Sequence, residues 1–177
     1  MVMEEVAAAI ERVKVALRRR PGMGIHDDSP ATVRWEGGTR TVARHANGAR
    51  VATDMPPGLG GGGGEVTPGW LFRAGLASCA ATTIAMRAAA EGIDLAFLEV
   101  EATSRSDTRG LIGLADASGE AVFAGPSDVE LHVRIRAPGV PAARLRELVE
   151  KGRRCAPVPN ALLSALPVGL RIDVEAA

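Results

Sequence analysis

The sequence is poor in residues on which several classes of function depend. It contains no tyrosine, and aromatic residues make up only 3% of its 177 residues. Proteins that bind single-stranded nucleic acid stack bases on several aromatic rings, so this composition argues against that class. Basic and acidic residues number 21 each, so the formal net charge is zero. The basic excess that binds a phosphate backbone is therefore missing, and a general nucleic-acid binder is disfavoured.

Long apolar runs are also missing. No stretch approaches the run of about 18 apolar residues that predicts a membrane-spanning helix. Glu4, Glu5 and Glu11 interrupt the apolar residues at the N-terminus, where a secretory signal would have a basic start and an unbroken apolar stretch. We therefore expect a cytoplasmic protein that acts at no membrane. The only two cysteines, Cys79 and Cys155, are too few for a secreted disulfide scaffold, so they are either buried filler or a redox pair.

Motifs for metals and cofactors are not found either. His26, His45 and His132 are far apart, and none lies at zinc-ligand spacing to a cysteine or an acid. The glycine run of residues 60–64 lacks the Lys-Ser/Thr pair of a phosphate loop and is expected to be a mobile loop. We expect neither a metal nor a cofactor.

The 46% of hydrophobic residues suffices for one domain built around helices. Residues 3–19 show apolar positions at a helical period, and we interpret residues 1–24 as an N-terminal helical extension of a single domain at 25–177. A long helix is expected from Thr67-Pro68, an N-cap pair, to about Glu91, before Gly92. Its middle is almost entirely small or apolar, which predicts burial on all sides and close packing against a second helix.

Strands are expected on both sides of this central helix. Three short strands fall within residues 31–54, and two longer ones at 95–104 and 129–135 flank a long connection or irregular hairpin at 105–127. This order predicts an α+β fold.

The C-terminal part is expected to form one more helix and one more strand. The helix opens at Pro141 and ends near Cys155, because Pro157 and Pro159 are expected to forbid a regular helix beyond it. A final alternating strand is expected at 168–174.

The sequence neighbours of Cys79 do not activate it. Cys79 lies about 18 Å from the start of the central helix, beyond the reach of the helix dipole. The residues three and four positions away carry no charge, which predicts a buried and inert thiol. A reactive Cys79 would need a cation from elsewhere in the fold or from a partner subunit, and the candidates are Arg34 and Arg40 in the N-terminal sheet.

Several segments together resemble the OsmC/Ohr family, which includes osmotically inducible protein C and the organic hydroperoxide resistance protein. The similarity covers residues 31–175. The helix expected at residues 3–19 lies outside it and looks like an extension of the domain. The matching pieces are the Gly37-Gly38-Thr39-Arg40 turn, Leu59-Gly60-Gly61, the helix from Pro68 to Thr83 with Gly92-Ile93, and Pro157-Val158-Pro159-Asn160-Ala161.

The resemblance implies an OsmC-like fold and a thiol chemistry. Family members are intertwined homodimers with an N-terminal antiparallel sheet, two long central helices, C-terminal strands and active sites at the dimer interface. They reduce organic hydroperoxides or peroxide. By this likeness Cys79 is the thiolate that becomes a sulfenic acid, Cys155 is the resolving cysteine, and a dithiol such as a lipoyl group resets the disulfide. Arg40 matches an arginine that is paired with a glutamate and supports the thiolate.

The sequence departs from the family at two of these positions. The glutamate would fall at Gly69 or Trp70, so this carboxylate is missing there. The second cysteine would fall at Ala156, and Cys155 lies one residue earlier, about 100° around a helix.

Three interpretations therefore stay open. The first is a thiol-dependent peroxidase acting on organic hydroperoxides in oxidative-stress defence. The second is a protein of the same fold without peroxidase turnover, which binds a small apolar or thiol-bearing ligand at a dimer groove. The third is a purely structural or interaction role. In each case the apolar central helix predicts a two-fold homodimer, because a chain this short has few elements to cover it.

Overall fold

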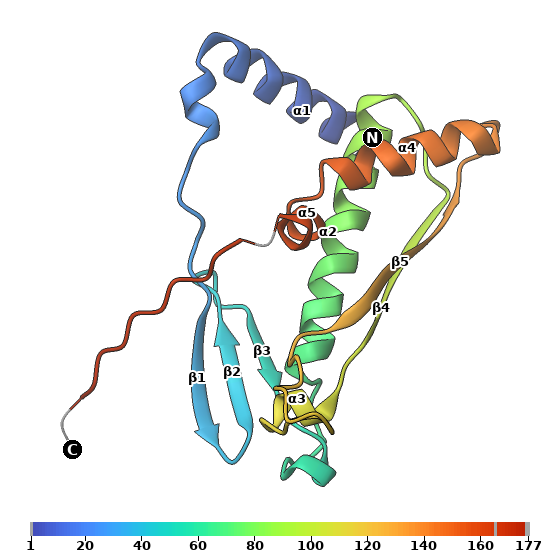
Figure 1. The fold of residues 1–177 in the computed structure, drawn as a ribbon. Helices are drawn as coiled ribbons and strands as arrows, with labels where there is room; N and C mark the ends of the chain where they lie inside the picture. The colour runs from blue at the N-terminus through green and yellow to red at the C-terminus, as the bar shows by residue number, and fades with distance from the viewer. Residues whose placement is uncertain (1, 165, 176–177) are drawn as a thin grey trace.

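The computed structural model describes residues 2–164 and 166–175 (Figure 1). It confirms the α+β class, with helices and antiparallel strands arranged around one long helix. In chain order the elements are α1 (Val2–Arg19), β1 (Thr32–Gly37), β2 (Arg40–Arg44), β3 (Arg50–Thr53), α2 (Pro68–Ala90), β4 (Phe97–Arg105), α3 (Thr108–Leu111), β5 (Ser127–Arg136), α4 (Ala142–Arg154) and α5 (Pro157–Leu163). Two short 3-10 turns lie at Pro21–Gly24 and Pro57–Leu59.

The central helix α2 begins and ends where local rules place its caps. The Thr67 hydroxyl accepts a hydrogen bond from the Trp70 N–H at 3.1 Å, and Pro68 occupies the first turn, where its missing N–H costs nothing. At the other end Gly92 adopts a φ of 65°, the left-handed conformation that a helix-terminating glycine supplies.

One face of α2 forms the core, and the opposite face is uncovered in the single chain. Leu76, Ala80, Ile84 and Ala88 are almost fully buried beneath α4 and β4, and α1 and α5 also pack on this helix. Met86 is 43% exposed, and Thr82 and Ser78, one and two turns before it, are exposed too. The expectation of burial on all sides is therefore wrong for one chain, because the described elements leave Ser78 and Thr82 exposed.

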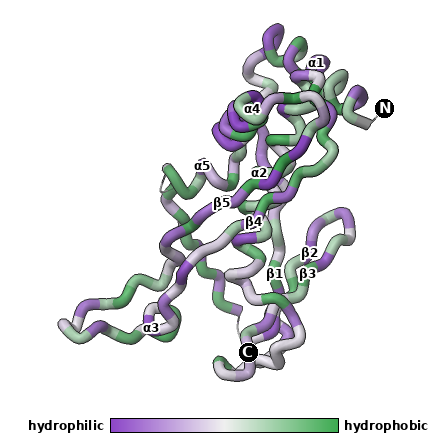
Figure 2. The backbone as a smooth tube through the Cα atoms, turned by 90° about the vertical axis from the view of Figure 1, so that its right-hand side faces the viewer, coloured by the Kyte–Doolittle hydropathy of each residue, from purple (hydrophilic) through white to green (hydrophobic). Residues whose placement is uncertain are grey.

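The strands form two separate antiparallel sheets. The first has the order β1-β2-β3 and lies toward the N-terminal end of α2, whereas β4 and β5 pair along the length of α2 (Figure 1). Inward-facing residues of β4 and β5 are directly paired, as in Val100 opposite Val133 and Ala102 opposite Leu131. Hydrophobic and hydrophilic residues alternate along both strands (Figure 2), which is the pattern of a sheet with one buried face.

The segment 105–127 is an irregular hairpin, as the sequence suggests. It contains α3 and a bridge between Ala115 and Ala121, and it projects beyond the N-terminal end of α2. The Asp107 carboxylate accepts a hydrogen bond from the Arg109 N–H at 2.9 Å and thereby caps α3.

Two expectations for the C-terminal part are wrong. Pro157 and Pro159 do not prevent a helix, because both lie in the first turn of α5, where backbone N–H groups have no partner within the helix. Residues 168–174 form no strand. They run as an extended tail away from the helices (Figure 1), and no described strand of the same chain lies beside them to pair with their backbone groups.

Helices α2 and α4 cross closely where Gly152 of α4 meets Ile84 of α2. A Cβ atom added at Gly152 of α4 would lie 2.7 Å from Ile84 Cγ1 and 2.8 Å from Ile84 Cα. Ile84 is fully buried and its backbone cannot retreat, so only glycine fits at this position. The expected close packing of the central helix against a second helix is confirmed at this crossing.

The crossing gives a direct test of the fold. We expect Gly152→Ala to lower the free energy of unfolding by about 1–3 kcal/mol, because the added methyl group overpacks the helix crossing. The measurement is urea denaturation followed by circular dichroism.

The matched control is Gly69→Ala in the first turn of α2, where an added Cβ would meet no atom closer than 3.8 Å. This variant should be at least as stable as the parent, since alanine favours helix over glycine. Equal stability of the two variants would contradict the tight crossing.

Candidate active site

Cys79 lies in the middle of α2, and its sulfur receives a hydrogen bond from another helix. The side chain is partly exposed, and the Val158 N–H at the start of α5 donates to Sγ at 3.4 Å. An N–H group that points at sulfur favours its negatively charged form. The sequence neighbours of Cys79 do not reveal this donor, because it comes from 79 residues further along the chain.

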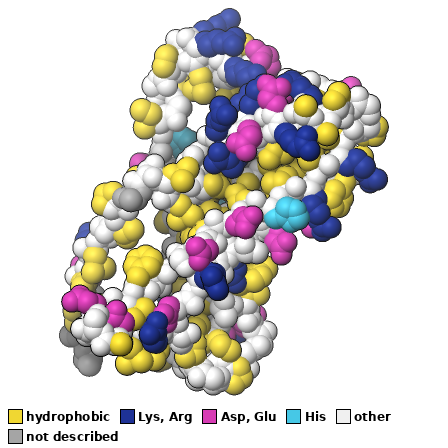
Figure 3. Space-filling model, turned by 45° about the vertical axis from the view of Figure 1, so that its right-hand side comes forward, with side chains coloured by type: hydrophobic (Ala, Val, Ile, Leu, Met, Phe, Trp, Pro, Cys, Tyr) yellow, Lys and Arg dark blue, Asp and Glu magenta, His cyan; other side chains and the backbone are white. Residues whose placement is uncertain are grey.

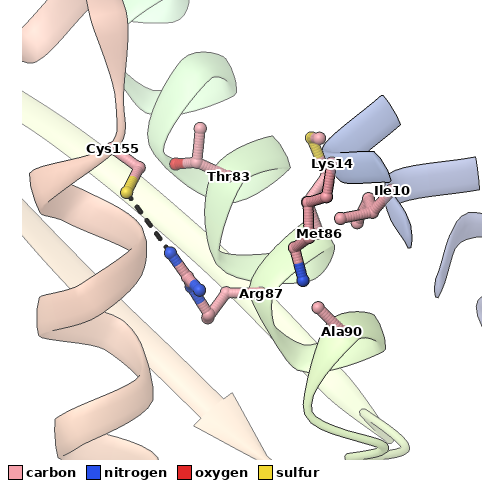
Figure 4. Close-up of a pocket in the computed structure, with 7 residues that line it drawn as sticks. All are labelled: Ile10, Lys14, Thr83, Met86, Arg87, Ala90 and Cys155. Carbon is pink, nitrogen blue, oxygen red and sulfur yellow. Dashed lines mark hydrogen bonds between the residues drawn. The ribbon is translucent and has the colours of Figure 1, made fainter. Parts of the chain in front are cut away.

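Cys155 lies at the C-terminal end of α4 and is more exposed than Cys79. Its sulfur accepts a hydrogen bond from Arg87 Nη2 at 3.4 Å (Figure 4). The guanidinium group of Arg87 is therefore directed at Cys155. A cation was expected beside a reactive Cys79, and this one lies beside Cys155 instead.

Cys155 lies against α2 further toward the C-terminal end of this helix than Cys79. Both are free thiols. Cys155 shares a small cavity with Thr83, Arg87 and Ala90, which follow Cys79 by one to three helical turns. Ala156, at the position of the family's second cysteine, has no exposed surface and faces the interior. The one-residue offset thus leaves alanine pointing inward and Cys155 at the surface.

Arg40 is held by carboxylates. Its Nη1 bonds to Glu65 Oε1 at 2.7 Å, and its Nε lies 3.4 Å from Glu36 Oε2. The hydrogen bond that Arg40 donates to Glu65 is the main cause that raises the pKa of Arg40. A carboxylate partner for this arginine thus exists, although the sequence has glycine and tryptophan at 69 and 70. It comes from Glu65, just before α2, and this pairing joins β2 to the loop that leads into the helix.

Asp54 organises the same loop, and the sequence did not single it out. Buried at the end of β3, it accepts hydrogen bonds from the Thr39 hydroxyl at 2.6 Å and from the Gly62 N–H at 2.7 Å. These bonds, with the Thr39 hydroxyl first, lower the pKa of Asp54. Gly61 packs directly on the Met55 carbonyl, which leaves no room for a Cβ atom. The glycine run is therefore fixed against β3 and carries Glu65 toward Arg40.

An apolar cavity of about 390 Å³ lies at the N-terminal end of α2. Its walls come from the loop before α2, from the first turns of α2 and from the 105–127 hairpin, and they include Leu59, Phe72, Arg73, Leu111 and Pro126. Phe72 precedes Cys79 by seven residues, about 10 Å along the helix. The hairpin, for which the sequence suggests no chemistry, thus forms one wall of a cavity two turns from Cys79.

The histidines lie outside this region. His26 is 3.6 Å from Asp28, and His132 is 3.9 Å from Glu101, both on the surface. The described residues contain no group of three metal-ligating side chains. Within the described part of the chain, no helix is long and apolar enough to cross a membrane.

Comparison with solved structures places the fold among known proteins. An OsmC-like protein from Mycoplasma pneumoniae is 18% identical, with a TM-score of 0.64, and the match covers 78% of this chain and 89% of that one. An organic hydroperoxide resistance protein from Elizabethkingia anophelis, crystallised with thiocyanate bound, is 26% identical, with a TM-score of 0.57 and coverage of 77% and 89%. One from Legionella pneumophila is 23% identical, with a TM-score of 0.53 and coverage of 78% and 90%.

The sequence itself carries the assignment. None of the curated proteins compared matches it. A family profile described as OsmC-like protein matches residues 60–171, which include α2 with Cys79, the β4–β5 sheet, and α4 and α5 with Cys155. This match spans well over half of the chain, and the neighbouring structures share its fold. The chain therefore belongs to the OsmC-like protein family.

Proposed function

We propose that this protein is a thiol-dependent peroxidase that reduces organic hydroperoxides in the cytoplasm, as part of oxidative-stress defence. The observation that carries the proposal is the setting of Cys79. Its partly exposed sulfur receives the Val158 N–H and lies two helical turns from an apolar cavity. Family membership and structural neighbours named organic hydroperoxide resistance proteins support the same role.

The first chemical step is attack of the Cys79 thiolate on the terminal peroxide oxygen. An S–O bond forms while the O–O bond breaks, so sulfur is oxidised to sulfenic acid and the peroxide is reduced to an alcohol after it takes up a proton. The Val158 N–H donates a hydrogen bond to the attacking sulfur and orients it. The apolar walls near Phe72 and Leu111 suit an organic group attached to the peroxide.

The second step is resolution by Cys155. Its thiolate attacks the sulfur of the Cys79 sulfenic acid, a disulfide forms as the S–O bond breaks, and the hydroxide that leaves takes up a proton to give water. A disulfide needs Cα atoms within about 7 Å and converging Cβ atoms, so the α4–α5 junction must turn Cys155 away from Arg87. A dithiol such as a lipoyl group then restores both thiols by exchange.

One observation favours a second candidate, a family member that binds a small apolar or thiol-bearing ligand without turnover. Cys155 is directed at Arg87, and alanine occupies the buried position beside it. If the junction does not turn, Cys79 has no resolving partner and its oxidation ends in an irreversible sulfinic acid.

The decisive measurements are consumption of cumene hydroperoxide with a dithiol present and, in a separate sample treated with peroxide without dithiol, mass spectrometry of both cysteines. We expect turnover and a Cys79–Cys155 disulfide in the wild type. Cys79→Ser should abolish consumption, because it removes the nucleophile, and Cys155→Ser should give one turnover followed by inactivation. Two free thiols after peroxide treatment would exclude the peroxidase, whereas sulfinic acid on Cys79 of the wild type would exclude resolution by Cys155.

We also propose that Arg40, held by Glu65, supports the Cys79 thiolate. Arg40→Ala should slow alkylation of Cys79 by iodoacetamide by about tenfold, the effect of one displaced charge. Arg34→Ala is the control. It removes a neighbouring arginine from β1, which pairs with β2, and should change the rate less. Equal alkylation rates in the wild type and Arg40→Ala would remove Arg40 from the site.

The working unit we propose is an intertwined homodimer of domain 25–177, with residues 1–24 as an added helical extension. The uncovered face of α2 supports it, as do the exposed apolar residues of the C-terminal tail: Leu166, Val168, Leu170, Ile172 and Val174. A tail with alternating apolar residues and unpaired backbone suits addition as a strand to a partner's sheet.

The dimer predicts a measurable mass. Light scattering at micromolar concentration should give twice the 18.3 kDa of one chain. Deletion of residues 166–177 should shift the protein toward the monomer, because it removes the tail that would pair. A monomeric wild type would contradict this assembly.

A further inference from the structure

A second cavity opens beside Cys155, apart from the apolar cavity at the N-terminal end of α2. It measures about 180 Å³ and is lined by residues of α1, α2 and the end of α4: Ile10, Lys14, Thr83, Met86, Arg87, Ala90 and Cys155 (Figure 4). A nucleophilic sulfur and two cations thus open into one small space. At about 30 Å³ per water, this space holds a short side arm of a ligand and not a large molecule.

Arg87 forms no ion pair with any acidic side chain that the structure describes. Among the described residues its only hydrogen-bond or ion-pair partner is Cys155 Sγ. Lys14 reaches into the cavity from α1, on the side of Arg87 away from Cys155 in the view of Figure 4. Lys14 is half-buried and lies 3.3 Å from Glu11, so its charge is shared with one carboxylate. The cavity therefore keeps a positive surplus beside an exposed thiol.

The surroundings add to this surplus. Basic side chains gather over the end of the molecule where α1 and α4 lie (Figure 3), although the whole chain has no net charge. The last turn of α4 carries Lys151, Arg153 and Arg154 directly before Cys155. Lys151 is paired with Glu147 and Arg153 with Glu150, so the added charge comes from Arg154, which forms no ion pair among the described residues. A field of one sign around a small opening attracts ligands of the opposite charge.

We propose that Cys155 is a site of thiol–disulfide exchange with small disulfides that carry carboxylate groups. The Cys155 thiolate attacks one sulfur of R–S–S–R, the new Cys155–S–S–R bond forms, and RS⁻ leaves and takes up a proton. Cys155 is oxidised, and the released half of the small disulfide is reduced, so the electrons balance. Arg87 donates a hydrogen bond to the sulfur, and Lys14 with Arg87 receives the carboxylate of the bound arm, while Ile10 and Met86 contact its carbon chain.

The test compares three aliphatic disulfides on the Cys79→Ser protein, whose only thiol is Cys155. The probes are 3,3′-dithiodipropionate, which is anionic, 2-hydroxyethyl disulfide, which is neutral, and cystamine, which is cationic. Rates of adduct formation are measured by mass spectrometry and divided by the rates of a free model thiol, N-acetylcysteine amide. This division removes the intrinsic reactivity of each probe.

The expected result is a normalised rate about tenfold higher for the anionic than for the neutral probe at low salt. The cationic probe should be slowest, and the preference should shrink as ionic strength rises. Arg87→Gln and Lys14→Gln should each reduce the preference, and Arg87→Lys should largely retain it because the charge stays. Arg12→Gln, on α1 outside this cavity, is the matched control and should leave the preference unchanged.

Equal normalised rates for the three probes, or an Arg87→Gln variant that keeps the full preference, would overturn the proposal. If Cys79→Ser does not fold, the same ratios are read from the Cys155 peptide of the wild-type protein. No peroxide is used, so loss of peroxidase activity and loss of this exchange are separate outcomes.

Discussion

The close crossing of α2 and α4 at Gly152 is the constraint on which the arrangement of both cysteines depends. Ile84 lies under Gly152 with no spare space, so the two helices cannot slide or rotate past each other there. Gly152 is three residues before Cys155, less than one helical turn. The crossing thus places the α4–α5 junction against α2: Cys155 lies beside Arg87, Ala156 faces inward, and α5 begins with its Val158 N–H at Cys79.

A second fixed point lies at the opposite end of α2. Asp54 bonds at once to the turn between β1 and β2 and to the glycine loop, so sheet and loop move as one piece. The Arg40–Glu65 pair spans the same junction. The two ends of α2 therefore present different chemistry: a paired arginine and an apolar cavity at one end, and an arginine directed at a thiol at the other. Cys79 lies between them and takes its hydrogen bond from α5.

Features set by local rules could be predicted from the sequence, and features set by distant contacts could not. Thr67, Pro68 and Gly92 act within one helical turn, so both ends of α2 were predictable. The resemblance indicated an arginine–carboxylate pair, but Glu65 lies outside the expected position and meets Arg40 only after the loop folds. Arg87 follows Cys79 by eight residues, about 80° around the helix, so neighbours three and four positions away could not reveal it.

The same distinction explains the two errors at the C-terminus. Proline was taken as incompatible with a helix, yet the N–H groups in the first turn of α5 have no hydrogen-bond partner within the helix, so proline loses nothing there. The 168–174 segment has the alternation of a strand, but a strand also needs a neighbour, and alternation does not say from which chain the neighbour comes.

The exposed tail also has a consequence for aggregation of the chain. Alternating apolar residues with unpaired backbone are a template for aggregation. In this tail Arg171, Asp173 and Glu175 stand between the apolar positions, and Arg171 and Asp173 lie 3.3 Å apart. Charges of both signs on alternate positions disfavour indiscriminate stacking of identical tails while leaving the apolar side free. The tail thus has an apolar side that can associate with another surface. Its charged side chains restrict which surfaces it can bind.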